Sequence, residues 1–309
     1  MPTDLARPPC RPLLLAGPTA VGKSAVALLL ADRLDGEIIS VDSMQVYRGL
    51  DLGTAKPSAA ERQRVPHHLI DVAGLTEPFD AARFVALAQT TVADIQSRGR
   101  LPILCGGTGL YFKAFLDGLG DAPPADPELV AALERTPLPD LLSELAEHDP
   151  VTFEKIDRQN PRRVIRAVGV IRQTGRPFSE QRALWSTGPQ ATTTRCFALT
   201  RASADLQTRI DARVDAMFAR GLVEETRRLL PCGLAENRTA LQAIGYRQVV
   251  EHLQGERSLA DTLELVKIRT RQYAKRQRTW LRRQLPVTWI EIQAGETPAA
   301  IADRLQAVL

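Results

Sequence analysis

The sequence is poor in residues that could cross-link the chain or bind a metal through nitrogen and sulfur. Its 309 residues include four cysteines that are widely separated and form no C-x-x-C pair, Cys10, Cys105, Cys196 and Cys232. This spacing predicts neither a disulfide framework nor a structural zinc site. Of the four histidines only His67 and His68 are adjacent, and neighbours in an extended segment point to opposite faces. We therefore expect no metal centre built from histidine or cysteine.

Long hydrophobic runs are also missing. No apolar stretch approaches the roughly 20 residues that a membrane-spanning helix needs, and Met1–Arg11 has no apolar core of the secretory-signal kind. Hydrophobic residues make up 44% and charged residues 25% of the chain, as in an ordinary globular protein. We expect a cytoplasmic protein without a membrane partner, with room for about two domains or for one core with an insertion.

The net charge of +4 is small, but the basic residues are unevenly distributed. Between Val266 and Arg283 there are eight basic residues and no acidic one, with Tyr273 and Trp280 among them. On a helix, three- and four-residue spacing would place five of them on one cationic stripe: Lys267, Arg271, Lys275, Arg278 and Arg282. A solvated helix face is the alternative. Because one sign of charge persists for about five turns, we favour a nucleic-acid surface.

The chain does contain a phosphate-binding motif. An apolar run, Leu13–Ala16, is followed by the G-x-x-x-x-G-K-[ST] pattern, which consists of Gly17, Pro18, Thr19, Ala20, Val21, Gly22, Lys23 and Ser24. Small residues let backbone N–H groups surround an anion at a helix N-terminus. Lys23 would reach the outer phosphates and the Ser24 hydroxyl would bind Mg²⁺. A kinase, an ATPase and a transferase that releases diphosphate would all need such a nucleotide- or diphosphate-binding loop.

Apolar runs alternate with helical periods, which predicts an α/β fold of the P-loop NTPase kind. Its mostly parallel sheet would have helices on both faces. The expected strands are Leu13–Ala16, Glu37–Val41, His68–Val72, Leu101–Cys105, Arg195–Leu199 and Val287–Ile292. Ligands bind such sheets at the carboxyl ends of the strands. The phosphate loop, Asp42–Gln45 and Gly106–Gly109 should therefore meet there.

A different pattern separates two parts of this core. Between Gly120 and Gly188, two proline-bearing stretches precede helical periodicity at Leu141–Glu147 and Arg162–Arg172, and no strand is predicted. We therefore predict core segments 1–119 and 191–309 around a small all-helical insertion domain, 120–190. The insertion contains a second set of basic residues, Arg158, Arg162, Arg163, Arg166, Arg172 and Arg176.

Asp42 directly follows the second predicted strand, Glu37–Val41, and should stand beside the phosphate loop. A carboxylate there can accept a proton or hold Mg²⁺ through water. Asp is also common as a cap or turn residue after a strand. The residue pattern alone does not choose between base and metal ligand.

Several blocks resemble one enzyme family, the bacterial tRNA dimethylallyltransferases, also called tRNA isopentenyltransferases. They follow the phosphate loop in the family's order, as Asp42–Arg48, Gly53–Pro57, Val65–Asp71, Gly106–Tyr111, Asn160–Arg163, Thr174–Pro177, Gly245–Gln248 and Arg276–Trp280. The family more often has Ser at the position of Val21 and Thr at that of Ser24. Ser24 keeps a hydroxyl for the metal.

This resemblance implies transfer of a dimethylallyl group from dimethylallyl diphosphate to the exocyclic amine of the adenosine 3′ of the anticodon, with release of diphosphate. The implied partner is the tRNA anticodon stem-loop, the cofactor is Mg²⁺, and the chain is expected to act as a monomer. Asp42 is the implied base. Thr19 and Arg213 are implied near the diphosphate, with Arg209 as the alternative one turn away.

The resemblance also implies contacts with tRNA. The corresponding residues are Asp42, Ser43, Met44, Gln45, Thr108, Gln159, Asn160, Pro161, Arg162, Arg163, Ala240, Leu241, Gln242, Ala243, Ile244 and Gly245, with Lys275 and Arg278 from the cationic stripe. A stacked anticodon-loop base cannot reach a cleft at a sheet edge, so the enzyme should extrude it.

Three other functions are compatible with parts of the sequence. A small-molecule P-loop kinase would use the same loop, Mg²⁺ and Asp42. A non-catalytic, nucleotide-dependent RNA-binding module would not need Asp42. A related isopentenyltransferase could act on free adenine nucleotides, although the helical insertion and the basic C-terminal helix count against it.

Overall fold

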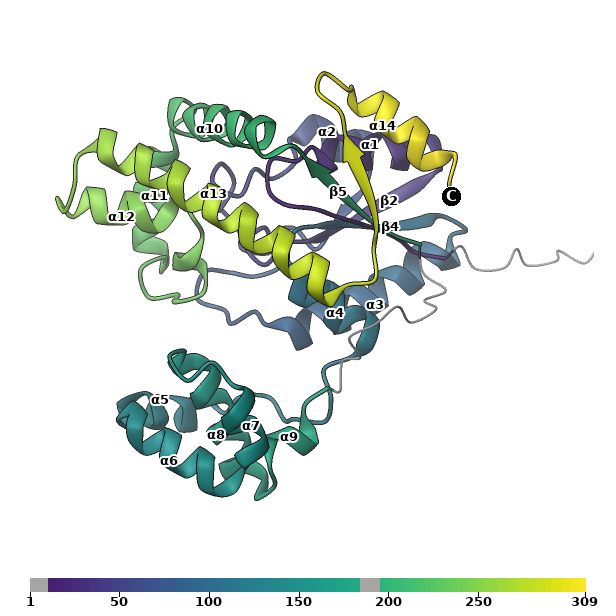
Figure 1. Cartoon of the computed structure of the whole chain (residues 1–309). Coiled ribbons are helices and arrows are strands. Elements are labelled where there is room, and N and C mark those ends of the chain that lie inside the picture. The colour runs from purple at the N-terminus through teal and green to yellow at the C-terminus, as the bar shows by residue number, and fades with distance from the viewer. Residues whose placement is uncertain (1–10, 184–194) are drawn as a thin grey trace, which may run out of the picture. The chain divides into compact units, whose positions relative to one another are not determined.

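In the computed structural model, which describes residues 11–183 and 195–309, a six-stranded sheet forms the centre of the larger unit (Figure 1). All described strand pairs are parallel, in the order β3-β2-β4-β1-β5-β6. The strands are β1 (Leu13–Ala16), β2 (Gly36–Val41), β3 (His67–His68), β4 (Leu101–Gly106), β5 (Arg195–Arg201) and β6 (Thr288–Ile292). The predicted α/β fold with a parallel sheet is confirmed.

The central strands are apolar, except for Glu37 and Ser40 of β2, because helices cover both faces of the sheet. Every residue of β1, β2 and β4 is buried, as expected for a parallel sheet. Helices α1 (Lys23–Arg33) and α14 (Pro298–Gln306) lie on one face, and α3 (Ala81–Ser97) and α4 (Gly109–Asp117) lie on the other (Figure 1). Tyr111 of α4 stacks on Phe84 of α3 with ring centroids 4.4 Å apart.

The third strand is much shorter than the predicted His68–Val72. Only His67 and His68 pair with β2. Leu69 and Asp71 have φ values of 59° and 60°, in the left-handed region, where a strand cannot continue. The prediction of this strand's extent was wrong because periodicity does not report such turns.

A buried carboxylate joins β2 to its neighbours. Glu37 is 1% exposed, and its oxygens bond to Nε2 of His68 at 2.7 Å, to Nη1 of Arg100 at 2.9 Å and to Arg98. The Arg98 hydrogen bonds, supported by those of His68 and Arg100, lower the pKa of Glu37 to about 2. This cluster ties β2, β3 and the start of β4 together.

The larger unit is completed by helices around the carboxyl ends of the strands. These are α2 (Ala59–Arg64), α10 (Ser203–Ala219), α11 (Leu222–Leu229), α12 (Tyr246–Leu253), α13 (Leu259–Gln284) and the short 3-10 helices η1 (Leu230–Cys232) and η2 (Ala240–Gln242). The side chain of Ser258 caps α13 by accepting from the Asp261 N–H. Helix α13 packs along α10, so the basic segment is one helix, as predicted.

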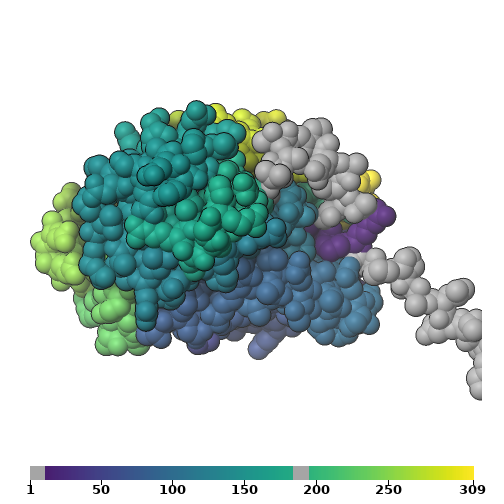
Figure 2. Space-filling view, turned by 90° about the horizontal axis from the view of Figure 1, so that it is seen from below, coloured from purple at the N-terminus to yellow at the C-terminus, as the bar shows by residue number. Residues whose placement is uncertain are grey.

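Residues 116–186 form a separate helical unit. The chain divides into Met1–Phe115 with Thr187–Leu309, and Leu116–Ser186; the predicted boundary at 190/191 lies outside the described residues. The smaller unit contains α5 (Pro127–Arg135), α6 (Leu138–His148), α7 (Pro150–Lys155), α8 (Pro161–Thr174) and α9 (Phe178–Gln181). It has its own apolar core, made by Leu133, Leu141, Leu145, Val164, Ala167 and Val168. Figure 2 shows the surface of this unit in teal.

The expectations on membrane spans and metal centres can be compared with the described residues only. Cys10 and all of Met1–Arg11 except Arg11 lie outside the described ranges. Within residues 11–183 and 195–309, no helix is long and apolar enough to cross a membrane. In the same ranges, no group of three or more His, Cys, Asp or Glu residues could hold a metal ion.

Candidate active site

The phosphate-binding motif forms the turn between β1 and α1. Gly22 precedes the first helical residue with φ 106°, a left-handed conformation that favours glycine. Two arginines from beyond β4 hold the turn: Arg201 Nε donates to the Val21 carbonyl at 2.8 Å, and Arg209 Nε donates to the Ala20 carbonyl at 3.0 Å. The loop is therefore shaped by β5 and α10 as well as by its own glycines.

A cavity of about 400 Å³ opens beside this loop at the carboxyl ends of the strands. Its polar lining includes Thr19, Lys23, Ser24, Asp42, Gln45 and Arg213, and its apolar lining includes Met44, Val214, Met217, Ile244 and Val266. The segments after β1 and β2 meet here as the parallel sheet predicts. The cavity thus joins a polar, phosphate-binding side to an apolar wall.

Asp42 is held by its own turn. Its Oδ1 accepts the backbone N–H of Met44 at 2.9 Å and that of Gln45 at 3.3 Å. The next residue is held by Thr108, whose hydroxyl accepts the Ser43 N–H at 3.1 Å. Within the described residues, Oδ2 of Asp42 has no hydrogen-bond partner. One oxygen therefore fixes the side chain and the other is available in the cavity.

The charges around Asp42 favour an anionic ligand. Burial lowers the pKa of Lys23, Arg213 lowers it further, and Asp42 opposes this shift. Burial also lowers the pKa of Arg213, again against the attraction of Asp42. Lys23 Nζ donates to the Pro18 carbonyl at 3.3 Å. Two partly desolvated cations thus share one carboxylate, and a bound phosphate group would favour their charged forms.

The structure distinguishes the two candidate arginines of α10. Arg213 lines the cavity with Asp42. Arg209 donates to the Ala20 carbonyl and lines a second, more open hollow together with Lys23, Ser24 and Arg213. Arg213 is therefore the one that faces the same space as Asp42.

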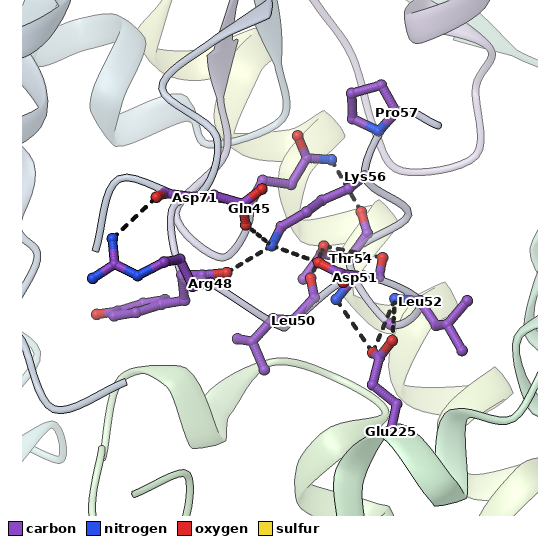
Figure 3. Close-up of polar contacts among 12 residues, drawn as sticks. Gln45, Arg48, Leu50, Asp51, Leu52, Thr54, Lys56, Pro57, Asp71 and Glu225 are labelled. Carbon is purple, nitrogen blue, oxygen red and sulfur yellow. Dashed lines mark hydrogen bonds and ion pairs between the residues drawn. The ribbon is translucent and has the colours of Figure 1, made fainter. Parts of the chain in front are cut away.

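A network of polar contacts holds the segment from Gln45 to Pro57 (Figure 3), from which Gln45, Gly53, Thr54 and Ala55 line the cavity. Gln45 Nε2 donates to the Thr54 carbonyl at 3.1 Å, and its Oε1 accepts from Ser40 at 2.8 Å. Lys56, whose side chain is 3% exposed, donates to the Tyr47 carbonyl at 2.7 Å and to carboxylates of Asp51 and Asp71 at 2.8 and 2.5 Å. This buried ammonium group holds the segment in a compact loop.

A buried glutamate holds the same loop from outside. Glu225 of α11 accepts the N–H of Leu52 at 2.9 Å and that of Asp51 at 3.2 Å (Figure 3). The hydroxyl of Tyr246 donates to Glu225 at 2.5 Å and accepts from the Gly53 N–H at 3.1 Å. Sequence reasoning missed Glu225, Lys56 and the Tyr246 hydroxyl as positioning groups. Lys56 and Tyr246 lay within matched blocks, but nothing in the sequence paired them with their partners.

The predicted RNA segment 240–245 lies beside the cavity. Gln242, Ala243 and Ile244 line it. Ala240 is buried, Leu241 is partly buried and belongs to η2, and Gly245 precedes α12. These positions stay compatible with the predicted contacts.

The cationic stripe of α13 is only partly a free surface. Lys267 pairs with Asp215 at 2.8 Å and Arg271 with Asp211 at 3.2 Å, both on α10. Arg282 stacks over Trp289 at 5.4 Å. The predicted continuous stripe was wrong because the packing of α13 on α10 neutralises part of it.

Lys275 and Arg278, which were also predicted in the stripe, lie on the side of α13 that faces α10. Other basic residues of α13 lie on the opposite side of the helix. Lys275 and Arg278 line a small hollow against α10, where Arg278 donates to Ser203 at 3.4 Å. The exposed basic side chains on the other side are Arg269, Arg276 and Arg283. Arg276 also lines the main cavity.

In the helical unit, the predicted RNA segment Gln159–Arg163 forms the start of α8. Asn160 caps the helix by accepting from the Arg163 N–H at 3.4 Å, and Pro161 occupies its first turn. Arg162 and Arg163 are exposed.

The second basic surface is smaller than predicted. Arg172 pairs with Glu144 at 2.6 Å, and Arg166 donates to the Pro123 carbonyl at 2.6 Å. Arg176 lies 3.5 Å from Glu180, and Arg158 stacks on Phe153 at 4.8 Å. Part of its charge therefore serves the packing of the unit itself.

The cavity contains protein groups that would suit Mg²⁺ bound together with a phosphate ligand. The hydroxyl of Ser24 and the carboxylate of Asp42 share it. Mg²⁺ usually keeps several waters and uses one or two protein groups with substrate phosphates. The donor set is therefore compatible with a metal that arrives with its phosphate.

Comparison with known proteins gives one consistent result. The model of the IPP transferase family matches residues 45–284. A tRNA dimethylallyltransferase 1 of Trichlorobacter lovleyi is 47% identical over 284 residues, which cover 91% of this chain and 93% of the relative. A tRNA dimethylallyltransferase of Anaeromyxobacter dehalogenans is 46% identical over 96% of this chain and 99% of the relative.

Solved structures agree with the sequence relatives. A full-length tRNA isopentenylpyrophosphate transferase from Bacillus halodurans is 38% identical, with a TM-score of 0.70 and coverage of 96% of this chain and 95% of that one. A eukaryotic dimethylallyltransferase acting on tRNA is 29% identical, with a TM-score of 0.77 and coverage of 91% and 74%.

Proposed function

The chain belongs to the IPP transferase family, and on that premise we propose that it transfers a dimethylallyl group to tRNA. The donor is dimethylallyl diphosphate, the acceptor is the N6 amine of the adenosine 3′-adjacent to the anticodon, and diphosphate is released. The observation that carries the proposal is a single cavity that joins a phosphate loop, a carboxylate and an apolar wall. The relatives' names favour transfer to tRNA over the kinase and the non-catalytic alternatives.

The phosphate loop would bind the leaving group. Breaking the allylic C–O bond leaves its electron pair on diphosphate and positive charge on the allyl fragment. Lys23, Arg213 and the loop amides would stabilise the developing negative charge, and Thr19 lies within the same loop. Mg²⁺ held by Ser24 and the diphosphate would neutralise further charge on the leaving group.

Asp42 would act as the base. As the new C–N bond forms, the amine of adenine must lose a proton, and Oδ2 of Asp42 is the oxygen available to accept it. The apolar residues Met44, Val214 and Ile244 line the same cavity. They would surround the allyl group and limit access of water to it.

The acceptor base would leave the RNA stack to reach this site. Gln45 and the segment 242–244 line the cavity, so they are the candidates to contact the extruded base. Exposed basic groups such as Arg276, Arg162 and Arg163 would bind phosphates, with little sequence information of their own. We further propose that the chain works as a monomer.

A labelling experiment tests this function. The purified protein is incubated with Mg²⁺, unmodified tRNA and allyl-labelled dimethylallyl diphosphate, with a tRNA carrying guanosine at the target position as the matched control. Label should enter only the adenosine-containing tRNA. Parallel reactions with AMP as acceptor, or with γ-labelled ATP and small-molecule acceptors, test the alternatives. Transfer to AMP alone, or passage of the γ-phosphate to a small molecule without allyl transfer, would overturn the proposal.

A further inference from the structure

We propose that Gln277 of α13 is a positioning residue that sets the phosphate loop for diphosphate binding; this rests on the proposed function. Its Oε1 accepts the backbone N–H of Thr19 at 2.9 Å, and its Nε2 donates to the Gly107 carbonyl at 2.9 Å. The residue is 8% exposed. One side-chain amide therefore bridges the loop after β1 and the turn after β4 from a helix that is 258 positions away from Thr19 in the sequence.

The orientation of this amide is fixed by its two partners. The Thr19 N–H lies on one side of the amide and the Gly107 carbonyl on the other. If the amide were reversed, its NH₂ group would face the Thr19 N–H and its oxygen would face the Gly107 carbonyl. The turn after β4 also fits closely around it: a Cβ on Gly107 would lie 2.3 Å from Gln277 Nε2. A side chain at position 107 would displace the amide, which explains glycine at this point of close approach.

The bridge fixes the direction of the Thr19 N–H in the phosphate loop. Thr19 contributes to the cavity lining, yet its N–H is bound to Gln277 and is not free for an anion. Arg201 and Arg209 donate to the carbonyls of Val21 and Ala20 in the same loop. The loop is thus held by hydrogen bonds from α13, β5 and α10 that need no ligand. Such preorganisation lowers the cost of binding a charged group.

The first test replaces the bridge by an apolar side chain. Gln277→Leu leaves the Thr19 N–H and the Gly107 carbonyl without their partner, and a lost buried hydrogen-bond partner corresponds to roughly a tenfold effect or more. We expect the Kd for inorganic diphosphate with Mg²⁺, and the KM for dimethylallyl diphosphate, to rise at least about tenfold, while the KM for tRNA stays within about twofold. Gln284→Leu, near the end of the same helix, is the matched control and should leave all three constants unchanged.

A second variant separates positioning from packing. In Gln277→Glu, a protonated carboxyl group can donate to Gly107 and accept from Thr19, whereas the carboxylate can only accept. The ratio of variant to wild-type Kd for inorganic diphosphate should therefore fall toward one as the pH is lowered, while the ratio for Gln277→Leu should stay constant. A glutamate ratio that is also constant with pH would reduce Gln277 to a packing residue and overturn the proposal.

Hydrogen exchange tests the bridge without any substrate. Backbone exchange in the peptide that contains Thr19 should be faster in Gln277→Leu than in the wild type and the Gln284→Leu control. The role of Gln277 would be refuted if exchange were unchanged, or if the KM for dimethylallyl diphosphate and the KM for tRNA rose by the same factor. If the wild-type protein binds no diphosphate but exchange is still faster in Gln277→Leu than in the wild type, the proposed function is refuted and the bridge is not. The two failures are therefore distinguishable.

Discussion

Replacing Asp42 by asparagine would separate its chemical role from its structural one. The Oδ1 atom accepts two backbone N–H groups, from Met44 and Gln45, and the amide oxygen of asparagine can accept the same bonds. Asp42→Asn therefore removes the charge and the base but keeps the turn. Asp42→Ala also loses both bonds, at about 0.5–1.5 kcal/mol each, so we expect alanine alone to lower the free energy of unfolding by roughly 1–3 kcal/mol.

The two effects of the missing charge have opposite signs. General-base catalysis typically contributes 10²–10⁴-fold, so the single-turnover rate of allyl transfer by Asp42→Asn should fall by about that factor. The carboxylate also attracts the charges of Lys23 and Arg213. Its removal leaves the cavity more positive, so the affinity for diphosphate should stay constant or increase.

Single-turnover rates and diphosphate titrations over a range of Mg²⁺ concentrations would measure both effects. A transfer rate within about tenfold of the wild type would refute Asp42 as the base. A weaker diphosphate affinity that is restored by high Mg²⁺ would instead identify Asp42 as a metal ligand. The variant thus decides between the two roles that the residue pattern leaves open.

Three further predictions concern stability and RNA binding. Because the folded-state pKa of Glu37 is lowered from 4.5 to about 2, its stabilisation is present above about pH 4.5 and is lost as the pH falls toward 2. Glu37→Gln should therefore lower the free energy of unfolding at pH 7 by no more than about 3 kcal/mol, and Tm with it. The difference in Tm between variant and wild type should shrink in acid. Arg276→Gln should weaken tRNA binding and reduce the slope of log K against log salt by about one, measured by titration at several salt concentrations. Arg271→Gln should change that slope little, because its guanidinium faces an aspartate of α10; equal slopes for both variants would contradict the assignment of faces on α13. Glu225→Ala, which removes the acceptor of the Leu52 N–H and of the buried Tyr246 hydroxyl, should cost about 2–4 kcal/mol in urea unfolding, whereas Glu224→Ala, at an exposed pair, should be nearly neutral.

The sequence by itself determined the fold class and the position of the phosphate site. Strand composition, the glycine spacing of the loop and the order of apolar runs are local properties, and each follows from the few residues that form it. They predicted that the residues after β1, β2 and β4 would meet at one edge of a parallel sheet. The extent of β3 was the exception, because two left-handed residues after His68 end it without a glycine to mark them.

Only the tertiary structure decided which side chains act together. The spacing of basic residues on α13 predicts a stripe, but whether Lys267 and Arg271 meet RNA or the acidic side of α10 depends on how two helices pack. The bridges made by Glu225 and Gln277 likewise depend on partners far away in the sequence. A local pattern cannot specify such pairs, because a hydrogen bond requires two groups within about 3 Å and only the folded chain brings them there.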